Sequence, residues 1–406
     1  MSKLVLTLTT ILVLMGCSDE VDQATSTDIT GTTAPKSGTG SEVVITDEMR
    51  RAASLDPVAR YETQEGELPA STPAGNLSVP RASHTESLLN TGKVIVIGGT
   101  RNPDNPEIYD PEENTWHQSD PMITPRTAHS ATVLQDNRII VTGGKGENGI
   151  LFSSEIYNVS SGKWSATGNM KQARRGHTAI LLESGKVLVA GGEISGGATN
   201  SAELFDPYLE TWSSAAPMST PRTGHRAILL LDGRVLVTGG ATFAGVLNKA
   251  ELYDPLSDSW TSTGSMNEPR TGHISILTRD GTVLVAGGQT LLLAPFIPVA
   301  SSEIFEPDTG TWIQMGSMSE SRSFATSILL DNGDVLILGG RDKIALKSVE
   351  IFDASTQTWR LVQGLSEVRR SHSATVLADG RVLIVGGRDE GGRLSTSELY
   401  EPNNLR

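Results

Sequence analysis

The sequence predicts an all-β protein, a seven-bladed β-propeller whose last blade is closed by an outer strand from the N-terminal side. Three observations predict this fold. A motif recurs seven times, at intervals of 45 to 52 residues, from residue 81 to the end of the chain. Each copy contains short β-branched or apolar runs separated by turn residues. Apart from one class of loop, the spacings inside the motif are constant, which is typical of a repeat architecture.

Each copy opens with an Arg and reaches a pair of glycines 17 residues later. The leading arginines are Arg81, Arg126, Arg174, Arg222, Arg270, Arg322 and Arg369. The Gly pairs begin at Gly98, Gly143, Gly191, Gly239, Gly287, Gly339 and Gly386. Further along each copy come a Glu, an aromatic residue two positions later and, in six copies, a Trp nine positions after the Glu. These six are all the tryptophans in the chain.

One copy, residues 222–260, shows how its strands are predicted. Residues 225–231 and 234–238 are apolar runs separated by Gly233, which suits a tight hairpin turn because Gly tolerates positive φ. A third strand is expected at 250–253, and Asp254-Pro255 turns the chain into a fourth strand near Trp260. Four short antiparallel strands describe one blade of a propeller.

The Gly pair after an apolar strand, followed by a spaced Tyr and Trp, resembles the kelch repeat. The resemblance covers about residues 81–406. It implies a kelch-type propeller, and in such propellers ligand-facing arginines occupy the rim. Because kelch propellers include galactose oxidase, the resemblance also raises a copper site built with a Cys crosslinked to a Tyr. The only Cys of this chain is Cys17, outside the propeller, so we exclude that activity.

The seventh copy stops at Glu401-Pro402, before a fourth strand or a Trp. Residues 75–81 match the exit from the fourth strand of other copies, such as 264–270, in register. We therefore expect residues near 68–76 to supply the missing outer strand, with Ser71 at the position of the Trp. The propeller domain is predicted to span 66–406.

The N-terminal region is predicted to be a lipoprotein leader and a tether. Residues 1–16 have a basic start and an apolar run too short to span a bilayer, as in a signal peptide. They end before Cys17 in a sequence that resembles the bacterial lipobox, in which the Cys is lipidated. Residues 17–65 begin with a Ser/Thr/Gly-rich stretch that cannot bury enough surface to fold, followed by a possible short helix at 46–53.

Residues repeated in every blade are assigned to the scaffold, because the geometry of the blade places them. This applies to the Glu, the aromatics, the Trp and the His that follows the leading Arg in six copies. Histidines spread around a ring stand too far apart to share a metal ion, so we predict no metal site and no cofactor. Departures from the repeat are where function is expected.

The variable loops predict the binding face. Between the Gly pair and the Glu lie 7, 10, 10, 10, 14, 9 and 10 residues, and loop variation on a rigid scaffold is where specificity is usually found. The 14-residue loop is also unusually apolar, which favours a contact surface. The candidate binding residues on this rim and in the channel are Arg101, Lys145, Glu193, Gln289, Leu292, Phe296, Arg341, Arg388, Arg175, Arg226, Glu86 and Arg370.

Two functions follow from these observations. The formal net charge of −14 disfavours nucleic acid, and no catalytic residue is predicted. We favour a monomeric, lipid-anchored binding module of the bacterial cell envelope that presents the propeller face to a protein or envelope glycan. The alternative is a small-carbohydrate enzyme resembling the kelch-type sialic-acid epimerases, with acid–base residues such as Glu86, Glu193 and Arg226.

Overall fold

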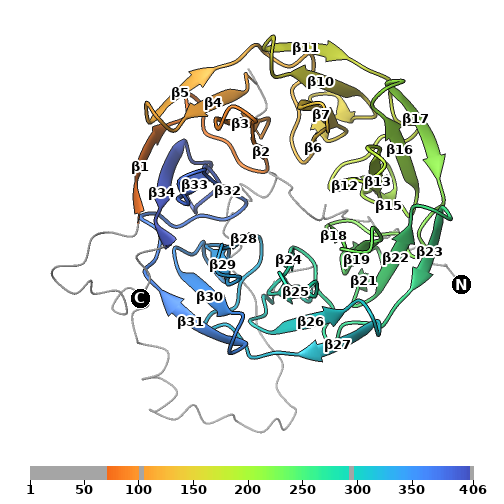
Figure 1. Cartoon of the computed structure of the whole chain (residues 1–406), viewed down its shortest axis with the longest axis vertical. Helices are drawn as coiled ribbons and strands as arrows, with labels where there is room; N and C mark the ends of the chain where they lie inside the picture. The colour runs from red at the N-terminus through yellow and green to blue at the C-terminus, as the bar shows by residue number, and fades with distance from the viewer. Residues whose placement is uncertain (1–70, 100–104, 292–296, 403–406) are drawn as a thin grey trace, which may run out of the picture. The chain divides into compact units, whose positions relative to one another are not determined.

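The structure, a computed structural model, describes residues 71–99, 105–291 and 297–402. In these ranges seven four-stranded antiparallel sheets stand around a central axis as the blades of a propeller (Figure 1). The predicted fold class is confirmed. In the described residues we find no helix with the length and hydropathy of a membrane span. The predicted leader, Cys17, the tether and the 46–53 helix lie outside the described ranges.

The innermost strands, in chain order, are β2 (Thr85–Leu88), β6 (Ser130–Val133), β12 (Thr178–Leu181), β18 (Arg226–Leu229), β24 (Ile274–Leu277), β28 (Thr326–Leu329) and β32 (Ser373–Val376). The second strands are β3 (Val94–Ile97), β7 (Arg138–Thr142), β13 (Val187–Ala190), β19 (Val235–Thr238), β25 (Val283–Ala286), β29 (Val335–Leu338) and β33 (Val382–Val385). These second strands are almost completely buried, because each is covered on both faces by neighbouring blades.

The third strands are β4 (Glu107–Asp110), β10 (Ser154–Asn158), β16 (Ala202–Asp206), β22 (Ala250–Asp254), β26 (Ser302–Glu306), β30 (Val349–Asp353) and β34 (Thr396–Tyr400). The outer strands are β5 (Thr115–Gln118), β11 (Lys163–Ala166), β17 (Thr211–Ala215), β23 (Ser259–Ser262), β27 (Thr311–Gln314), β31 (Thr358–Val362) and β1 (Ser71–Asn76). We number the blades 1 to 7 from β2 to β32.

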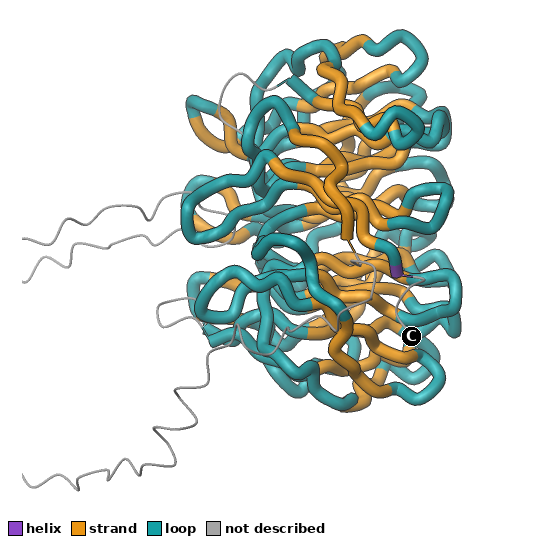
Figure 2. Tube along the Cα trace, turned by 90° about the vertical axis from the view of Figure 1, so that its left-hand side faces the viewer, coloured by secondary structure: helices purple, strands orange, loops and turns teal. Residues whose placement is uncertain are grey.

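Three two-stranded ribbons extend the loops between second and third strands. They are β8 (Lys145–Gly146) with β9 (Gly149–Ile150), β14 (Glu193–Ile194) with β15 (Gly197–Ala198), and β20 (Ala241–Thr242) with β21 (Gly245–Val246). Antiparallel strands alternate direction, so these loops share one face with the linkers between blades. We call it the loop face, and the opposite face, with the hairpin turns, the turn face. From the side, strands fill the middle of the propeller and loops form both faces (Figure 2).

The ring closes as predicted from the sequence. β1 pairs with β34 as the outer strand of blade 7, and Ser71 lies opposite Tyr400, where the other blades place a Trp opposite the aromatic residue. The seam is reinforced across the chain ends, because the Trp116 indole donates to the Ala74 carbonyl at 3.1 Å and the Ser397 hydroxyl donates to the Gly75 carbonyl at 2.7 Å. The outer strand therefore comes from the N-terminal side and holds the last blade in place.

Each leading arginine is a buried staple within its copy. Arg222 donates to the Gly239 carbonyl at 2.7 Å and forms an ion pair with Glu251 at 2.6 Å. Glu251 in turn accepts the backbone N–H of Ser219, in the linker from the preceding blade, at 2.7 Å. All seven copies repeat the Arg–Glu pair at 2.6 to 2.9 Å. The sequence showed the repeat of both residues but not their pairing.

The Gly pair is required by close approach between blades as well as by its positive φ. A Cβ on Gly239 would lie 2.3 Å from the Arg270 carbonyl oxygen of the next blade, and one on Gly240 would lie 2.8 Å from His225 Cβ. The predicted scaffold role of the histidines agrees with their contacts. The His225 imidazole, for example, is hydrogen-bonded through Nε2 to the Thr178 hydroxyl of blade 3 at 3.0 Å.

Candidate functional site

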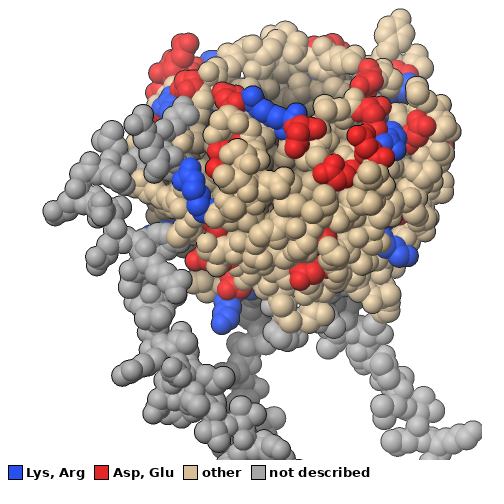
Figure 3. Space-filling view, turned by 60° about the horizontal axis from the view of Figure 1, so that its bottom comes forward, with Lys and Arg blue, Asp and Glu red and all other residues tan. Residues whose placement is uncertain are grey.

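The mouth of the channel on the loop face is ringed by a closed circle of backbone hydrogen bonds. In each blade the residue two positions after the leading Arg has positive φ, and its N–H donates to the carbonyl of its counterpart in the preceding blade at 2.8 to 3.3 Å. The seven residues are Ser83, Ala128, Gly176, Gly224, Gly272, Phe324 and Ser371. The opposite mouth, on the turn face, is visible in Figure 3 as a hollow at the centre of the propeller, with acidic and basic side chains close together.

Phe324 is the exceptional member of this circle. A bulky residue at φ 54° is strained, at a cost of about 1–3 kcal/mol, and such strain is concentrated at functional sites. Its ring lies over Gly272, where an added Cβ would stand 2.9 Å from the ring. The side chain is half-buried, so part of the ring is exposed to solvent. Blade 6 therefore places an aromatic surface where the other blades have Gly, Ala or Ser.

In blades 2 to 7 the rim above this circle is built from two residues per blade. The residue after the leading Arg forms an antiparallel β-bridge with the residue after the Gly pair. Lys145, Gln289 and Arg341 occupy the second of these positions, opposite Thr127, Thr271 and Ser323. These candidates therefore stand at equivalent places around one rim.

Arg175 and Glu193 are brought together on blade 3. They are bridged partners and also form a buried ion pair, with Arg175 Nη2 at 2.9 Å from Glu193 Oε1. The side chains are only 3% and 11% exposed, so their charges are largely committed to each other. Both were predicted to face a ligand, but their geometry is that of a structural pair in the rim.

Blade 7 gathers three arginines. Arg388 is bridged to Arg370 on one side and to Arg393 on the other, so three guanidinium-bearing residues stand in one register. Side chains of bridged antiparallel partners project to the same face of the ladder. Arg370 lies next to Ser371, whose N–H donates to the Phe324 carbonyl at 3.0 Å. The row therefore lies next to the backbone of Phe324, whose ring lies over Gly272 of blade 5.

Two contacts order the loops around this row. Glu390 accepts the backbone N–H of Ala345 at 2.7 Å, which ties the loop of blade 7 to that of blade 6. Asp389 accepts the N–H groups of Gly391 and Gly392 at 2.8 Å and so fixes the turn before Arg393. Sequence reasoning missed Arg393. In the sequence, Arg393 could have been recognised by its position just after that turn, which places it opposite the candidate Arg388.

The two charged residues of the inner strands lie in different seams. The exposed Arg226 on β18 donates through Nε to the His273 carbonyl at 2.7 Å, toward blade 5. Glu86 on β2 faces Ser373 and Thr375 of blade 7, and burial raises the pKa of its carboxyl to about 7. Glu193 is paired with Arg175, and the other two lie in different seams. No two of Glu86, Glu193 and Arg226 therefore form the acid–base pair that the enzymatic alternative needs.

Four candidate positions lie outside the described residues, namely Cys17, Arg101, Leu292 and Phe296. The residues that flank the apolar loop, Leu291 and Ile297, are each 46% exposed. Two exposed aromatic residues, Phe152 and Phe243, lie in other loops of the same face.

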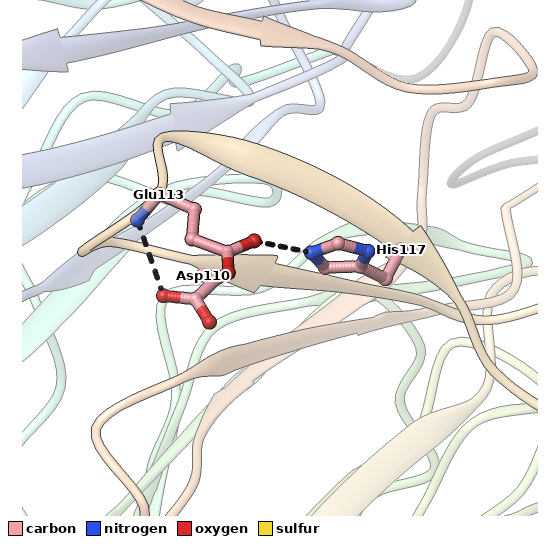
Figure 4. Close-up of side chains that lie close together, drawn as sticks. All are labelled: Asp110, Glu113 and His117. Carbon is pink, nitrogen blue, oxygen red and sulfur yellow. Dashed lines mark hydrogen bonds and ion pairs between the residues drawn. The ribbon is translucent and has the colours of Figure 1, made fainter.

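One cluster in the described ranges has the composition of a metal site. Ligand atoms of Asp110, Glu113 and His117 lie within 4.8 Å of one another at the outer edge of blade 1 (Figure 4). Asp110, however, is paired with Lys93 at 2.7 Å and caps the turn by accepting the Glu112 N–H at 3.0 Å. Asp206 and Asp254 cap the same turn in other blades. We therefore assign Asp110 to the repeated turn and propose no metal there.

Known protein families match this chain within its repeat region. A family profile described as the KLHDC2/KLHL20/DRC7 Kelch-repeats domain matches residues 83–288, and one described as Kelch motif matches 325–366. No curated protein matches the chain.

Among solved structures, a fungal alcohol oxidase of the AA5 family in complex with copper has a TM-score of 0.68 and 18% identity, covering 84% of this chain and 77% of its own. The structure of YjhT has a TM-score of 0.57 and 16% identity, covering 70% of this chain and 98% of its own. At these identities the likeness extends to the fold alone.

Proposed function

This chain belongs to the kelch-repeat β-propeller family, and on that premise we propose that it is a non-catalytic binding module that presents its loop face to a protein or glycan partner at the bacterial cell envelope. Residues 1–17 support the location, because they have the pattern of a lipoprotein leader ending at a lipidated Cys. We propose no resident metal. The propeller has no Cys, and three of its buried tyrosines, Tyr109, Tyr157 and Tyr253, pack against tryptophans at the outer edge of their blades.

The row of Arg370, Arg388 and Arg393 is the observation on which the proposal depends. A planar guanidinium binds a carboxylate through two parallel hydrogen bonds, and several in one register suit a partner that bears carboxylates. On blade 6 the half-buried ring of Phe324, which lies over Gly272, adds an apolar surface that a peptide side chain or a sugar ring can cover. The row is also a departure from the repeat, so the scaffold does not require it.

Charge reversal on the two faces tests this assignment. Arg388→Glu should abolish capture of the partner by crosslinking in the envelope and weaken binding to acidic peptides or acidic glycan fragments at least tenfold. Arg234→Glu reverses the same charge on the turn face and should leave capture unchanged. The peptide and glycan arms distinguish the two kinds of partner. Equal capture by both variants, with unchanged melting temperatures, would contradict the proposal.

Fractionation tests the proposed location separately. Cys17→Ser removes the thiol on which the lipid would be attached, and lipid chains supply about 0.8 kcal/mol per buried methylene. The variant should move from the membrane fraction to the soluble fraction. An unchanged membrane fraction would overturn the lipid anchor.

A further inference from the structure

Glu86 is the one acidic residue on the seven inner strands. Its counterparts are Ala131, Ala179, Ala227, Ser275, Ser327 and Ala374. The side chain faces the preceding blade, because its neighbours Ser373 and Thr375 lie on β32 of blade 7. Glu86 therefore lies in the seam where the first blade meets the last.

A linker crosses this seam, from β1 to β2, as one crosses each of the other six, but blade 7 alone is built from both ends of the propeller. Strands β32–β34 of blade 7 meet the N-terminal segment β1–β2 only through non-covalent contacts, because β1 pairs with β34 and β2 packs against β32. The ring is therefore closed by the β1–β34 pairing within blade 7 together with the contacts between β2 and β32 in this seam.

The carboxyl group is poorly compensated in this seam. Both oxygens are buried, and neither accepts a hydrogen bond of ordinary geometry. The nearby Ser373 and Thr375 hydroxyls lower the pKa of the carboxyl and so offset part of the rise that burial causes. Ser373 is also shared, because its hydroxyl lies 2.6 Å from His84 Nε2. An ionised carboxylate held here without a cation is costly, whereas a neutral carboxyl donates a hydrogen bond.

The charged and titratable groups around the seam do not supply that cation. His84 is neutral, because burial and the neighbouring Arg81 and Arg369 lower its pKa to about 3. His372, on blade 7, has its pKa lowered well below the usual range, mainly by burial. Arg81 is paired with Glu107 at 2.7 Å, and Arg369 with Glu398 at 2.9 Å.

We propose that Glu86 is a proton-operated latch of ring closure, in which the neutral carboxyl holds the seam between blades 7 and 1 and its ionisation loosens that seam. The pH dependence follows from linkage. With a pKa of about 7 in the closed seam and 4.5 when exposed, the closed state retains a proton that the open state loses. The contribution to closure is complete below pH 4.5, falls as pH rises, and is lost above about pH 7.

Hydrogen exchange of the full-length chain tests the latch. We compare peptides covering β1–β2 and β32–β34 at pH 6 and pH 8, after correction for intrinsic exchange rates. Opening of the closure seam should increase about tenfold between these two pH values. Glu86→Gln should abolish the increase, as should Glu86→Ala, which copies the residue of other blades. Glu112→Gln, which removes the same charge from an exposed position of blade 1, should retain it.

The contrary results are equally defined. A tenfold increase that persists in Glu86→Gln and Glu86→Ala would show that another group titrates. An equal increase in wild-type peptides covering β12–β19, on blades 3 and 4, would show that the effect is not confined to the closure seam. Either result would overturn the latch.

Discussion

The seam between blades 3 and 4 and the seam between blades 7 and 1 have the same framework but different chemistry. In the first, the Thr178 hydroxyl lies 3.0 Å from His225 Nε2, and the residue two positions after this His is Ala227. In the second, Ser373 meets His84 at 2.6 Å, and Glu86 replaces the Ala. The comparison teaches that one side chain can change the charge and pH response of a seam without altering the backbone that the repeat imposes.

A third seam shows a different departure. Between blades 5 and 6 the hydroxyl is replaced by Ile274 and the His by Ala325, and both belong to one apolar cluster. In this seam both members of the polar pair are replaced, whereas the seam between blades 4 and 5 keeps His273 beside Arg226. The departures fall mainly on one arc, from Ile274 and Phe324 through the arginine row of blade 7 to Glu86, while blades 2 and 3 keep the regular pair.

The largest effect is expected from breaking the staple common to both seams. Arg222→Ala leaves Glu251 buried without its cation, which should lower the free energy of unfolding by about 3–5 kcal/mol in chemical denaturation. Arg81→Ala, beside the closure seam, should cost a similar amount because it removes the same pair. Arg234→Ala, which breaks an exposed ion pair, is the control and should cost at most about 1 kcal/mol. Equal losses for Arg222→Ala and Arg234→Ala would refute the staple.

A smaller effect is expected from restoring the regular pair in the apolar seam. Ala325→His places an imidazole against Ile274 without a hydroxyl partner, which should destabilise the protein by about 1–3 kcal/mol. Adding Ile274→Thr should recover about 1 kcal/mol by rebuilding the hydrogen bond. A double-mutant cycle from denaturation midpoints measures this coupling. A double variant no more stable than Ala325→His would show that the pair is not an exchangeable unit.

The sequence by itself determined the fold, the number of blades and the closure by a strand near residues 68–76. It did so because a period with constant spacings leaves the backbone little choice, and because a copy that lacks its fourth strand needs one from elsewhere. Gly233 was predictable for the same local reason, since hairpin turns require positive φ, and it has a φ of 83°.

The tertiary structure alone decided which candidate residues meet. Arg175 and Glu193 are 18 positions apart, and only their bridge across the rim makes them a buried pair. The row that includes Arg393, the strain at Phe324 and the buried position of Glu86 against blade 7 likewise depend on contacts between segments distant in the sequence. Periodicity fixes where a side chain is attached. Its partner and its desolvation are set by the neighbouring blade, which the repeat does not specify.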